Sequence, residues 1–204
     1  MIGILDYGMG NISSVNNSLD YLGFETKIIQ SLDDMNSGIS HLIVPGVGSY
    51  SKAMDNLRTK KLDTLIYKFV KTGKPYLGIC LGMQLLSSIG YEDGKTKGLD
   101  LIKGEVVPFD ISLHIPHVGW NNIDCKKIHQ VFGNQSDHLD FYFVHSYYFK
   151  ASSSEDILTT TNYEIDFCSS IVKNNLIGVQ FHPEKSQEPG LNFLEKFCTW
   201  DGKC

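Results

Sequence analysis

Short apolar runs alternate with stretches of helical spacing through the first half of this chain, and that alternation is what most constrains its fold. Strand candidates lie at residues 1–6, 24–30, 41–46 and 75–79, and helical patterns at 11–22, 50–72 and 81–88. The runs at 41–46 and 75–79 are apolar almost throughout, which is typical of strands buried on both faces. This β-α-β-α-β order predicts a mostly parallel central sheet with helices on both faces.

The second half of the chain changes character. Between residues 99 and 180 short strand candidates predominate, at 103–109, 139–149, 156–161, 167–173 and 176–181. They predict an antiparallel extension of the sheet. Residues 188–200 close the chain as a helix with Pro189 near its start. No repeat or linker interrupts the pattern, so we expect one α/β domain over residues 1–204.

Composition excludes several classes of function. The net charge of −5 leaves no strong basic field for nucleic acid, and no apolar run approaches the roughly 20 residues that span a bilayer. The first residues do not resemble a signal peptide. The five cysteines are odd in number and irregular in spacing, which favours reduced thiols in the cytoplasm. Apart from Cys80, we expect them to be packing or incidental residues: Cys125, Cys168, Cys198 and Cys204.

Two motifs invite a cofactor or metal assignment, and neither supports one. The stretch "YGMGNIS" has Ser13 where a dinucleotide fingerprint has its third glycine, and a convincing acidic partner is missing. His114, His117, Cys125 and His129 gather in one stretch, but their spacing fits no zinc pattern well. We expect them to be exposed polar residues in a loop. We therefore predict no metal and no cofactor.

Cys80 stands between two glycines in "GICLG", where an apolar strand meets a helical pattern. This is the arrangement of a nucleophile elbow, with cysteine in place of serine. A helix beginning after Cys80 would favour the thiolate, and the N–H of Leu81 would be a donor for an oxyanion. A buried structural cysteine in a strand-to-helix turn is the alternative, and the pentapeptide alone does not decide between them.

The stretch "GVQFHPEKS" ends an apolar strand at His182, followed by Pro183 and Glu184. In an extended chain residues i and i+2 face the same way, and Pro183 would keep the pair extended. Glu184 would then hold one imidazole nitrogen while the other faces a nucleophile. The alternative is a surface histidine beside a surface glutamate, but together with Cys80 the pattern favours a Cys-His-Glu triad.

A third stretch, "VPGVGSY", follows a strand candidate with two glycines that allow backbone N–H groups to turn toward a ligand. In a parallel sheet this loop would lie at the same edge as the Cys80 turn. It is a candidate second oxyanion donor at Val47 and Gly48. An ordinary strand-to-helix turn is the simpler interpretation of this stretch taken alone.

"GICLGMQLL" with "GVQFHPEKS" resembles the class I, triad-type glutamine amidotransferases. The remaining motifs, "DYGMGN", "VPGVGSY", "PHVGWN", "FYFVHSYY" and "HPEKSQ", narrow the resemblance to the HisH-type glutaminase subunits of imidazole glycerol phosphate synthase. The resemblance covers essentially the whole chain, with the motifs in order.

The resemblance implies roles for specific positions. Cys80 would attack the side-chain amide of glutamine, His182 would act as base and then acid, and Glu184 would orient His182. Leu81 and the Val47–Gly48 loop would stabilise the oxyanion. Gln84 and the backbone at Ser146 and Tyr147 would hold the substrate. Residues near a partner interface would be Asn11, Trp120, Asn121 and Lys185.

The implied partner is a separate (β/α)8 cyclase of the HisF type, forming a heterodimer and receiving ammonia through a tunnel. The family pattern also implies an oxyanion loop that must turn before catalysis. Three alternatives stay open at this stage. One is a HisH-like enzyme that supplies ammonia for amination of a bacterial surface sugar. The others are a cysteine peptidase or γ-glutamyl hydrolase, and a catalytically silent scaffold.

Overall fold

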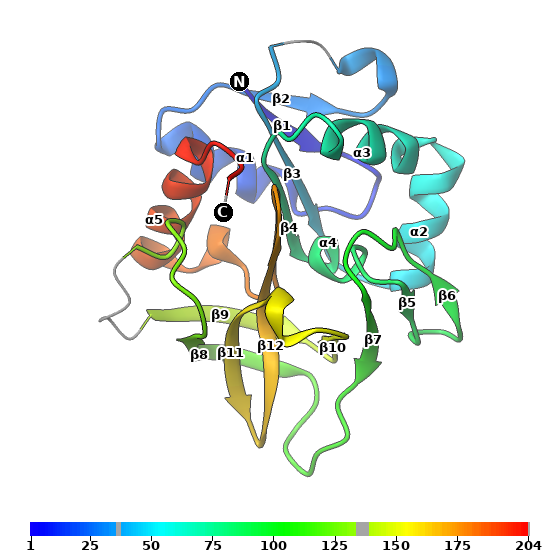
Figure 1. Ribbon diagram of the computed structural model, residues 1–204, viewed down its shortest axis with the longest axis vertical. Helices are drawn as coiled ribbons and strands as arrows, with labels where there is room; N and C mark the ends of the chain where they lie inside the picture. The colour runs from blue at the N-terminus through cyan, green and yellow to red at the C-terminus, as the bar shows by residue number, and fades with distance from the viewer. Residues whose placement is uncertain (36–37, 134–138, 204) are drawn as a thin grey trace.

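The computed structural model describes residues 1–35, 38–133 and 139–203, and it has an α/β architecture (Figure 1). At its centre five strands run parallel in the order β2-β1-β3-β4-β13. Their bounds are β1 Ile2–Leu5, β2 Thr26–Ile29, β3 His41–Gly46, β4 Tyr76–Cys80 and β13 Leu176–Val179. Both β3 and β4 are buried along their whole length, as their apolar runs predict. The mostly parallel central sheet is confirmed.

An antiparallel extension continues from β13 in the order β12-β10-β7-β5-β6, with only β5 and β7 parallel. A side branch runs from β12 through β11 and β8 to β9. The strands are β5 Ile89–Gly90, β6 Thr96–Lys97, β7 Gly104–Pro108, β8 His117–Cys125, β9 Leu139–His145, β10 Tyr147–Ala151, β11 Ile157–Tyr163 and β12 Ile165–Lys173. The predicted extension in the second half is therefore confirmed.

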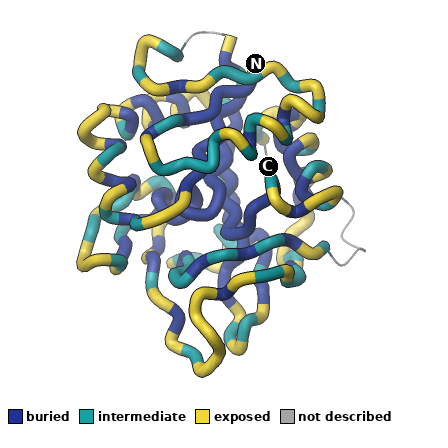
Figure 2. Tube along the Cα trace, turned by 180° about the vertical axis from the view of Figure 1, so that it is seen from behind, coloured by how far each residue is buried: buried dark blue, intermediate teal, exposed yellow. Residues whose placement is uncertain are grey.

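Helices cover both faces of the parallel strands (Figure 1). They are α1 Ile12–Tyr21, α2 Tyr50–Thr59, α3 Leu62–Val70, α4 Leu81–Gln84 and α5 Gln187–Thr199, with 3-10 turns η1 Leu32–Asp34, η2 Ser154–Asp156 and η3 Pro183–Lys185. The inner faces of α2 and α3 pack in one apolar cluster and those of α1 and α5 in another. Figure 2 shows the central strands as the buried interior between them.

Several sequence expectations need correction. The helix expected at 50–72 is two helices, because the chain breaks at Lys61, which has a φ of 57°. The helix expected at 81–88 ends at Gln84, and the N–H groups of Leu86 and Ser87 bond three residues back. The strand expected at 139–149 is interrupted at Ser146.

The stretch around His117 is also different from the expectation. It lies in β8 rather than in an exposed loop, and both His117 and His129 are buried. His114 is exposed, as expected, and Cys125 is half-buried. The apolar surroundings of His117 come from strands distant in sequence, which is why the local polar composition was misleading.

Cys168 and Cys198 are buried free thiols, while Cys204 lies outside the described residues. In the part of the chain that the structure describes, no helix has the length and apolar character needed to cross a membrane.

The two glycines that flank Cys80 allow the backbone of α4 to lie directly against the sheet. A Cβ on Gly82 would overlap the carbonyl oxygen of Val44 in β3, and a Cβ on Gly78 would overlap the backbone of Gly82. Neither glycine has a positive φ, so backbone conformation alone does not require a glycine at either position. Both are required by the close approach of two backbones, which leave no room for a side chain.

We expect Gly82→Ala to lower the free energy of unfolding by about 3 kcal/mol, because the added methyl group forces α4 away from β3. Urea denaturation followed by circular dichroism would measure the loss. Gly94→Ala is the matched control: Gly94 has a φ of 97° but open space around its Cβ position. It should lose only about 1 to 2 kcal/mol from backbone strain. Equal losses in the two variants would contradict the packing argument.

Candidate active site

Cys80 ends β4 and precedes α4, and its backbone is strained. Its φ is 53° and its ψ is −108°, a conformation that residues with a side chain rarely adopt. The residue is 6% exposed and lies at the carboxyl edge of the parallel strands, with β3 on one side and β13 on the other. The strand-to-helix turn that the sequence predicts is present. The helix that follows has only four residues, so a helix dipole has little part in the charge state of the sulfur.

His182 and Glu184 form a buried pair, but not by the extended geometry that the sequence suggested. The last strand ends at Val179, and Pro183 begins the 3-10 turn η3. The turn brings Glu184 Oε1 to 2.8 Å from His182 Nδ1, and both side chains are 1% exposed. Ser186 Oγ donates to His182 O at 2.6 Å and accepts from Tyr142 N at 2.9 Å, which ties the turn to β9.

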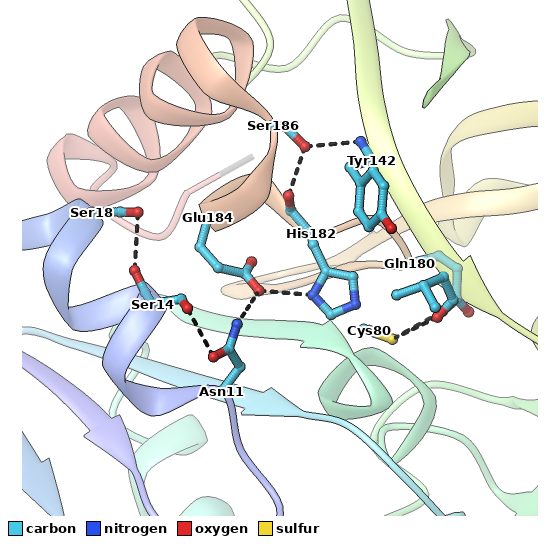
Figure 3. Close-up of polar contacts among 10 residues, drawn as sticks. Asn11, Ser14, Ser18, Cys80, Tyr142, Gln180, His182, Glu184 and Ser186 are labelled. Atoms are coloured by element: carbon cyan, nitrogen blue, oxygen red, sulfur yellow. Dashed lines mark hydrogen bonds and ion pairs between the residues drawn. The ribbon is translucent and has the colours of Figure 1, made fainter. Parts of the chain in front are cut away.

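Asn11, which precedes α1, supports the His182–Glu184 pair with a hydrogen bond (Figure 3). Its Nδ2 donates to Glu184 Oε1 at 3.3 Å, and its Oδ1 accepts from Ser14 Oγ at 2.8 Å. Its side chain makes no capping hydrogen bond to the backbone of α1. The start of α1 instead supplies a hydrogen bond to the buried carboxylate.

The charges of the neighbouring groups control the imidazole of His182. Burial alone would lower its pKa, but the negative charge of a Cys80 thiolate and the bonded Glu184 carboxylate outweigh burial and raise the pKa to about 10. Nε2 of His182 is buried and has no hydrogen-bond partner among the described residues. At neutral pH the imidazole of His182 therefore favours its protonated form.

The sulfur of Cys80 has two other polar neighbours. The side-chain amide of Gln180 donates to Sγ at 3.6 Å, and the carbonyl oxygen of Val144 lies 3.9 Å from Sγ. Gln180 is fully buried, and its Oε1 accepts from Gln84 Nε2 at 3.0 Å. The sequence reasoning did not single out Gln180. Its position two residues before His182 is the signal that was available, since alternate residues of a strand share a face.

A cavity of about 530 Å³ opens beside Cys80 and brings together most of the residues singled out by sequence. Its lining includes Val47, Gly48, Cys80, Leu81, Gln84, Ser146, Tyr147 and Lys185. Glu92 and Pro116 also line it and were missed. Glu92 accepts from Tyr50 N at 2.8 Å, and burial raises its pKa.

A larger cavity, of about 700 Å³, lies elsewhere, beside Lys127, Ile128 and Asp156. It contains none of the predicted site residues, so we assign the chemistry to the smaller one. Among the described residues there is no group of three or more His, Cys, Asp or Glu side chains that could hold a metal ion.

The loop after β3 keeps its backbone donor turned away from the cavity. Val47 N donates to Met9 O at 2.7 Å, and Gly48 has a φ of 102°. The Val47 side chain is 41% exposed. The N–H that the sequence offers as an oxyanion donor is thus already bonded to the loop that follows β1.

Of the residues expected near a partner, Lys185 lines the cavity, and Trp120 packs against Tyr142, the ring beside Lys185. We call this edge of the cavity the rim. Trp120, in β8, is 49% exposed, and Asn121 beside it is half-buried. The ammonium of Lys185 lies 6.0 Å from the centre of the Tyr142 ring. Asn11 is half-buried beside Glu184.

Comparison with known proteins agrees with this geometry. The model of the family "Glutamine amidotransferase class-I" matches residues 3–199. The chain belongs to this family, which confirms that it is a glutamine-hydrolysing enzyme of the class I fold.

Its curated relatives carry a more specific name. The imidazole glycerol phosphate synthase subunit HisH of Moorella thermoacetica is 43% identical over 196 residues, covering 96% of this chain and 93% of the relative. The HisH subunit of Chlorobaculum tepidum is 43% identical over 202 residues, covering 98% and 100%. That of Aquifex aeolicus is 41% identical over 194 residues, covering 95% and 94%.

Solved structures share the fold at lower identity. A glutamine amidotransferase crystal structure superposes with a TM-score of 0.76 at 18% identity, covering 98% of this chain and 100% of the other. PurLQS from Thermotoga maritima gives a TM-score of 0.77 at 17% identity, covering 97% and 96%. At these identities the likeness concerns the fold alone.

We expect Glu184→Gln to lower the pKa of His182, because the variant removes the carboxylate charge that stabilises the imidazolium. An NMR titration of the His182 ring would measure the change. Glu188→Gln is the control, since it removes the same charge from an exposed position in the first turn of α5. An unchanged His182 pKa in Glu184→Gln would contradict the electrostatic account of the pair.

Proposed function

We propose that this chain is the glutaminase subunit of an imidazole glycerol phosphate synthase, which serves histidine biosynthesis by hydrolysing L-glutamine to L-glutamate and ammonia. The observation that carries the proposal is the buried His182–Glu184 pair beside a cysteine in a strained turn that opens into a cavity. The names of the curated relatives support the same conclusion.

The reaction begins when Cys80 Sγ, as a thiolate, attacks the side-chain amide carbon of glutamine. His182, which has already taken the thiol proton, gives a proton to the amide nitrogen. The C–N bond then breaks, and ammonia leaves a γ-glutamyl thioester on Cys80. Water attacks the thioester carbon and gives its proton to His182, and glutamate departs as the thiol is regenerated. Glu184 orients the imidazole and stabilises its charge throughout.

The tetrahedral intermediate carries a negative oxygen that needs donors. We assign the N–H of Leu81 as one donor and a backbone N–H of the Val47–Gly48 loop as the other. The hydrogen bond from Val47 N to Met9 O occupies the loop donor in the resting state. The loop must therefore turn before catalysis, which gives a partner a point of control.

Substrate binding is assigned to the lining of the cavity. Gln84 and the backbone of Ser146 and Tyr147 would hold the glutamine in position for attack. The substrate also carries an α-ammonium group. Glu92 supplies a carboxylate in the same cavity, and this supports a role in binding that group.

Ammonia released into water becomes ammonium, which is not a nucleophile, so a partner must receive it directly. We propose a (β/α)8 cyclase subunit of the HisF type as that partner, docked in a heterodimer over Asn11, Trp120, Asn121 and Lys185. Exposed apolar surface on β8, at Val118 (54% exposed) and Trp120, supports an interface at this rim.

The same glutaminase step would serve an enzyme that aminates a surface sugar. The names of the relatives favour imidazole glycerol phosphate as the product of the complex. Free thiols at Cys80, Cys125, Cys168 and Cys198 suit a reducing compartment, and we propose that the enzyme works in the cytoplasm.

We expect Cys80→Ala to reduce glutamate release by about 10⁴-fold or more, because no other group in the cavity replaces the nucleophile. The assay measures glutamate from glutamine in the complex with the cyclase, with the ligand of the cyclase present. Cys125→Ala is the control and should keep the wild-type rate. Turnover that persists in Cys80→Ala would contradict the proposed mechanism.

We expect Val47→Pro to lower the partner-stimulated rate by about 10²- to 10³-fold, since proline lacks the N–H that would stabilise the oxyanion. The unstimulated rate should change far less, because that state does not use this donor. Val47→Ala keeps the N–H and should respond to the partner like the wild type. Full stimulation of Val47→Pro would show that the donor lies elsewhere.

A further inference from the structure

Two buried histidines that the proposed chemistry does not use lie in contact beside the cavity, and one of them, His145, lines it. His117 in β8 and His145 at the end of β9 are 3% and 6% exposed, and they face each other across the strand pair. His117 Nδ1 lies 3.0 Å from His145 Nε2. In such a contact one nitrogen donates and the other accepts, so the protonation states of the two rings are coupled.

The hydrogen-bond partners on either side of the histidine pair determine which ring nitrogens donate. Asn121 Oδ1 accepts from Asn122 N at 2.9 Å, and Asn121 Nδ2 donates to the carbonyl oxygen of Asn162 at 3.0 Å. The amide is thereby oriented, and its Nδ2 donates to His117 Nε2 at 3.2 Å. At the other end, His145 Nδ1 lies 2.9 Å from the carbonyl oxygen of Tyr147, which can only accept.

These two outer hydrogen bonds allow only one direction for the hydrogen bond between the two rings. His117 Nε2 accepts and His145 Nδ1 donates, so His117 Nδ1–H must donate to His145 Nε2. Both rings are then neutral and both carry their proton on Nδ1. An added proton on either ring would place a hydrogen on His117 Nε2, against the donating amide of Asn121. The chain of hydrogen bonds therefore has a fixed direction and excludes a charge.

The surroundings agree with neutral rings. His117 is stacked between Phe143, at 4.9 Å between ring centres, and Tyr163, at 4.1 Å. Burial among these rings lowers the pKa of His117 to about 4 and that of His145 to about 3. A neutral His145 also avoids repulsion with the imidazolium of His182.

The chain continues from Tyr147 to the nucleophile. The carbonyl oxygen of Tyr147 also accepts from Gln84 Nε2 at 2.9 Å, and Gln84 donates to Gln180 Oε1 at 3.0 Å. Gln180 Nε2 then donates to Cys80 Sγ at 3.6 Å. Asn121 in β8 and Cys80 in the cavity are thus joined through side chains and a single backbone carbonyl.

We propose that His117 and His145 are positioning residues: their directed hydrogen bonds hold the Tyr147 carbonyl and Gln84 in the geometry that receives glutamine, and join them to Asn121 in β8. The proposal rests on the proposed function, because it assigns these groups to glutamine binding. The direction of the hydrogen bonds is testable without any activity.

The first test reads the tautomers directly. Long-range ¹H–¹⁵N NMR of the ¹⁵N-histidine-labelled protein at pH 7 should show His117 and His145 as neutral rings protonated on Nδ1. Single His→Gln variants assign the signals. A ring protonated on Nε2, or a charged ring, at either position would overturn the assigned direction of the hydrogen bonds. This result stands even if the protein releases no glutamate, so it separates failure of that assignment from failure of the proposed function.

The second test compares two amides at position 145. An asparagine nitrogen lies about where Nδ1 lies, whereas a glutamine nitrogen lies about where Nε2 lies. His145→Gln should lose the bond to Tyr147 and raise the KM for glutamine about tenfold, the effect of about 1.4 kcal/mol, with kcat changed much less. His145→Asn should keep the KM within about threefold. Equal KM values in two folded variants would overturn the positioning role.

The third test changes Asn121, at the other end of the hydrogen-bond chain from Cys80. Asn121→Asp has the same shape but presents an acceptor to His117 Nε2, which reverses the chain and removes the proton from His145 Nδ1. The His145 signal should switch to the Nε2–H form, and the KM of the isolated chain should rise. Asn122→Asp adds the same charge one residue away and should leave both unchanged. A His117 ring that stays neutral and protonated only on Nδ1 in Asn121→Asp would overturn the coupling.

Discussion

The contact between the backbone of α4 and the backbone of β3 sets the position of Cys80, the proposed nucleophile. Gly82 lies against the carbonyl oxygen of Val44, and Gly78 against the backbone of Gly82, so the chain must reverse within the single residue Cys80. The reversal forces a φ of 53° on that residue and holds its sulfur at the carboxyl edge of the sheet. Because packing on both sides determines this turn, the strain at Cys80 persists and the sulfur has little freedom to move.

The neighbouring strand β13 extends this constraint to His182. It pairs with β4 in parallel register, so Gln180 and His182, which follow it, emerge next to Cys80. A buried carboxylate at Glu184 is tolerated only because His182 and Asn11 both bond its Oε1. The elements that meet here are distant in sequence: β1 leads to Asn11, β4 to Cys80 and β13 to His182. The site is therefore a property of the sheet order and not of any one motif.

Sequence reasoning succeeded where the physics is local. The strand-to-helix turn at Cys80 and the buried strands were predictable because glycine spacing and apolar runs report directly on backbone geometry. It failed where contacts with strands distant in the sequence determine the local structure. The 3-10 turn at Pro183 replaces the expected extended segment because Ser186 ties that turn to β9. His117 was expected in a loop because its aromatic neighbours, Phe143 and Tyr163, come from other strands. Glu92 carries no local signal of a cavity.

In the proposed mechanism two hydrogen bonds hold the resting site back from reaction. Val47 N–H is bound to Met9, and the Gln180 amide is bound to the nucleophilic sulfur. Each is worth about 1 kcal/mol net, whereas an oxyanion donor lowers the barrier by about 2.7 to 4 kcal/mol. The free energy needed to turn the loop is therefore smaller than the amount by which the oxyanion donor lowers the barrier. A partner that binds the turned loop only slightly better than the resting loop can switch the enzyme, because a ligand shifts an equilibrium by its difference in affinity for the two states.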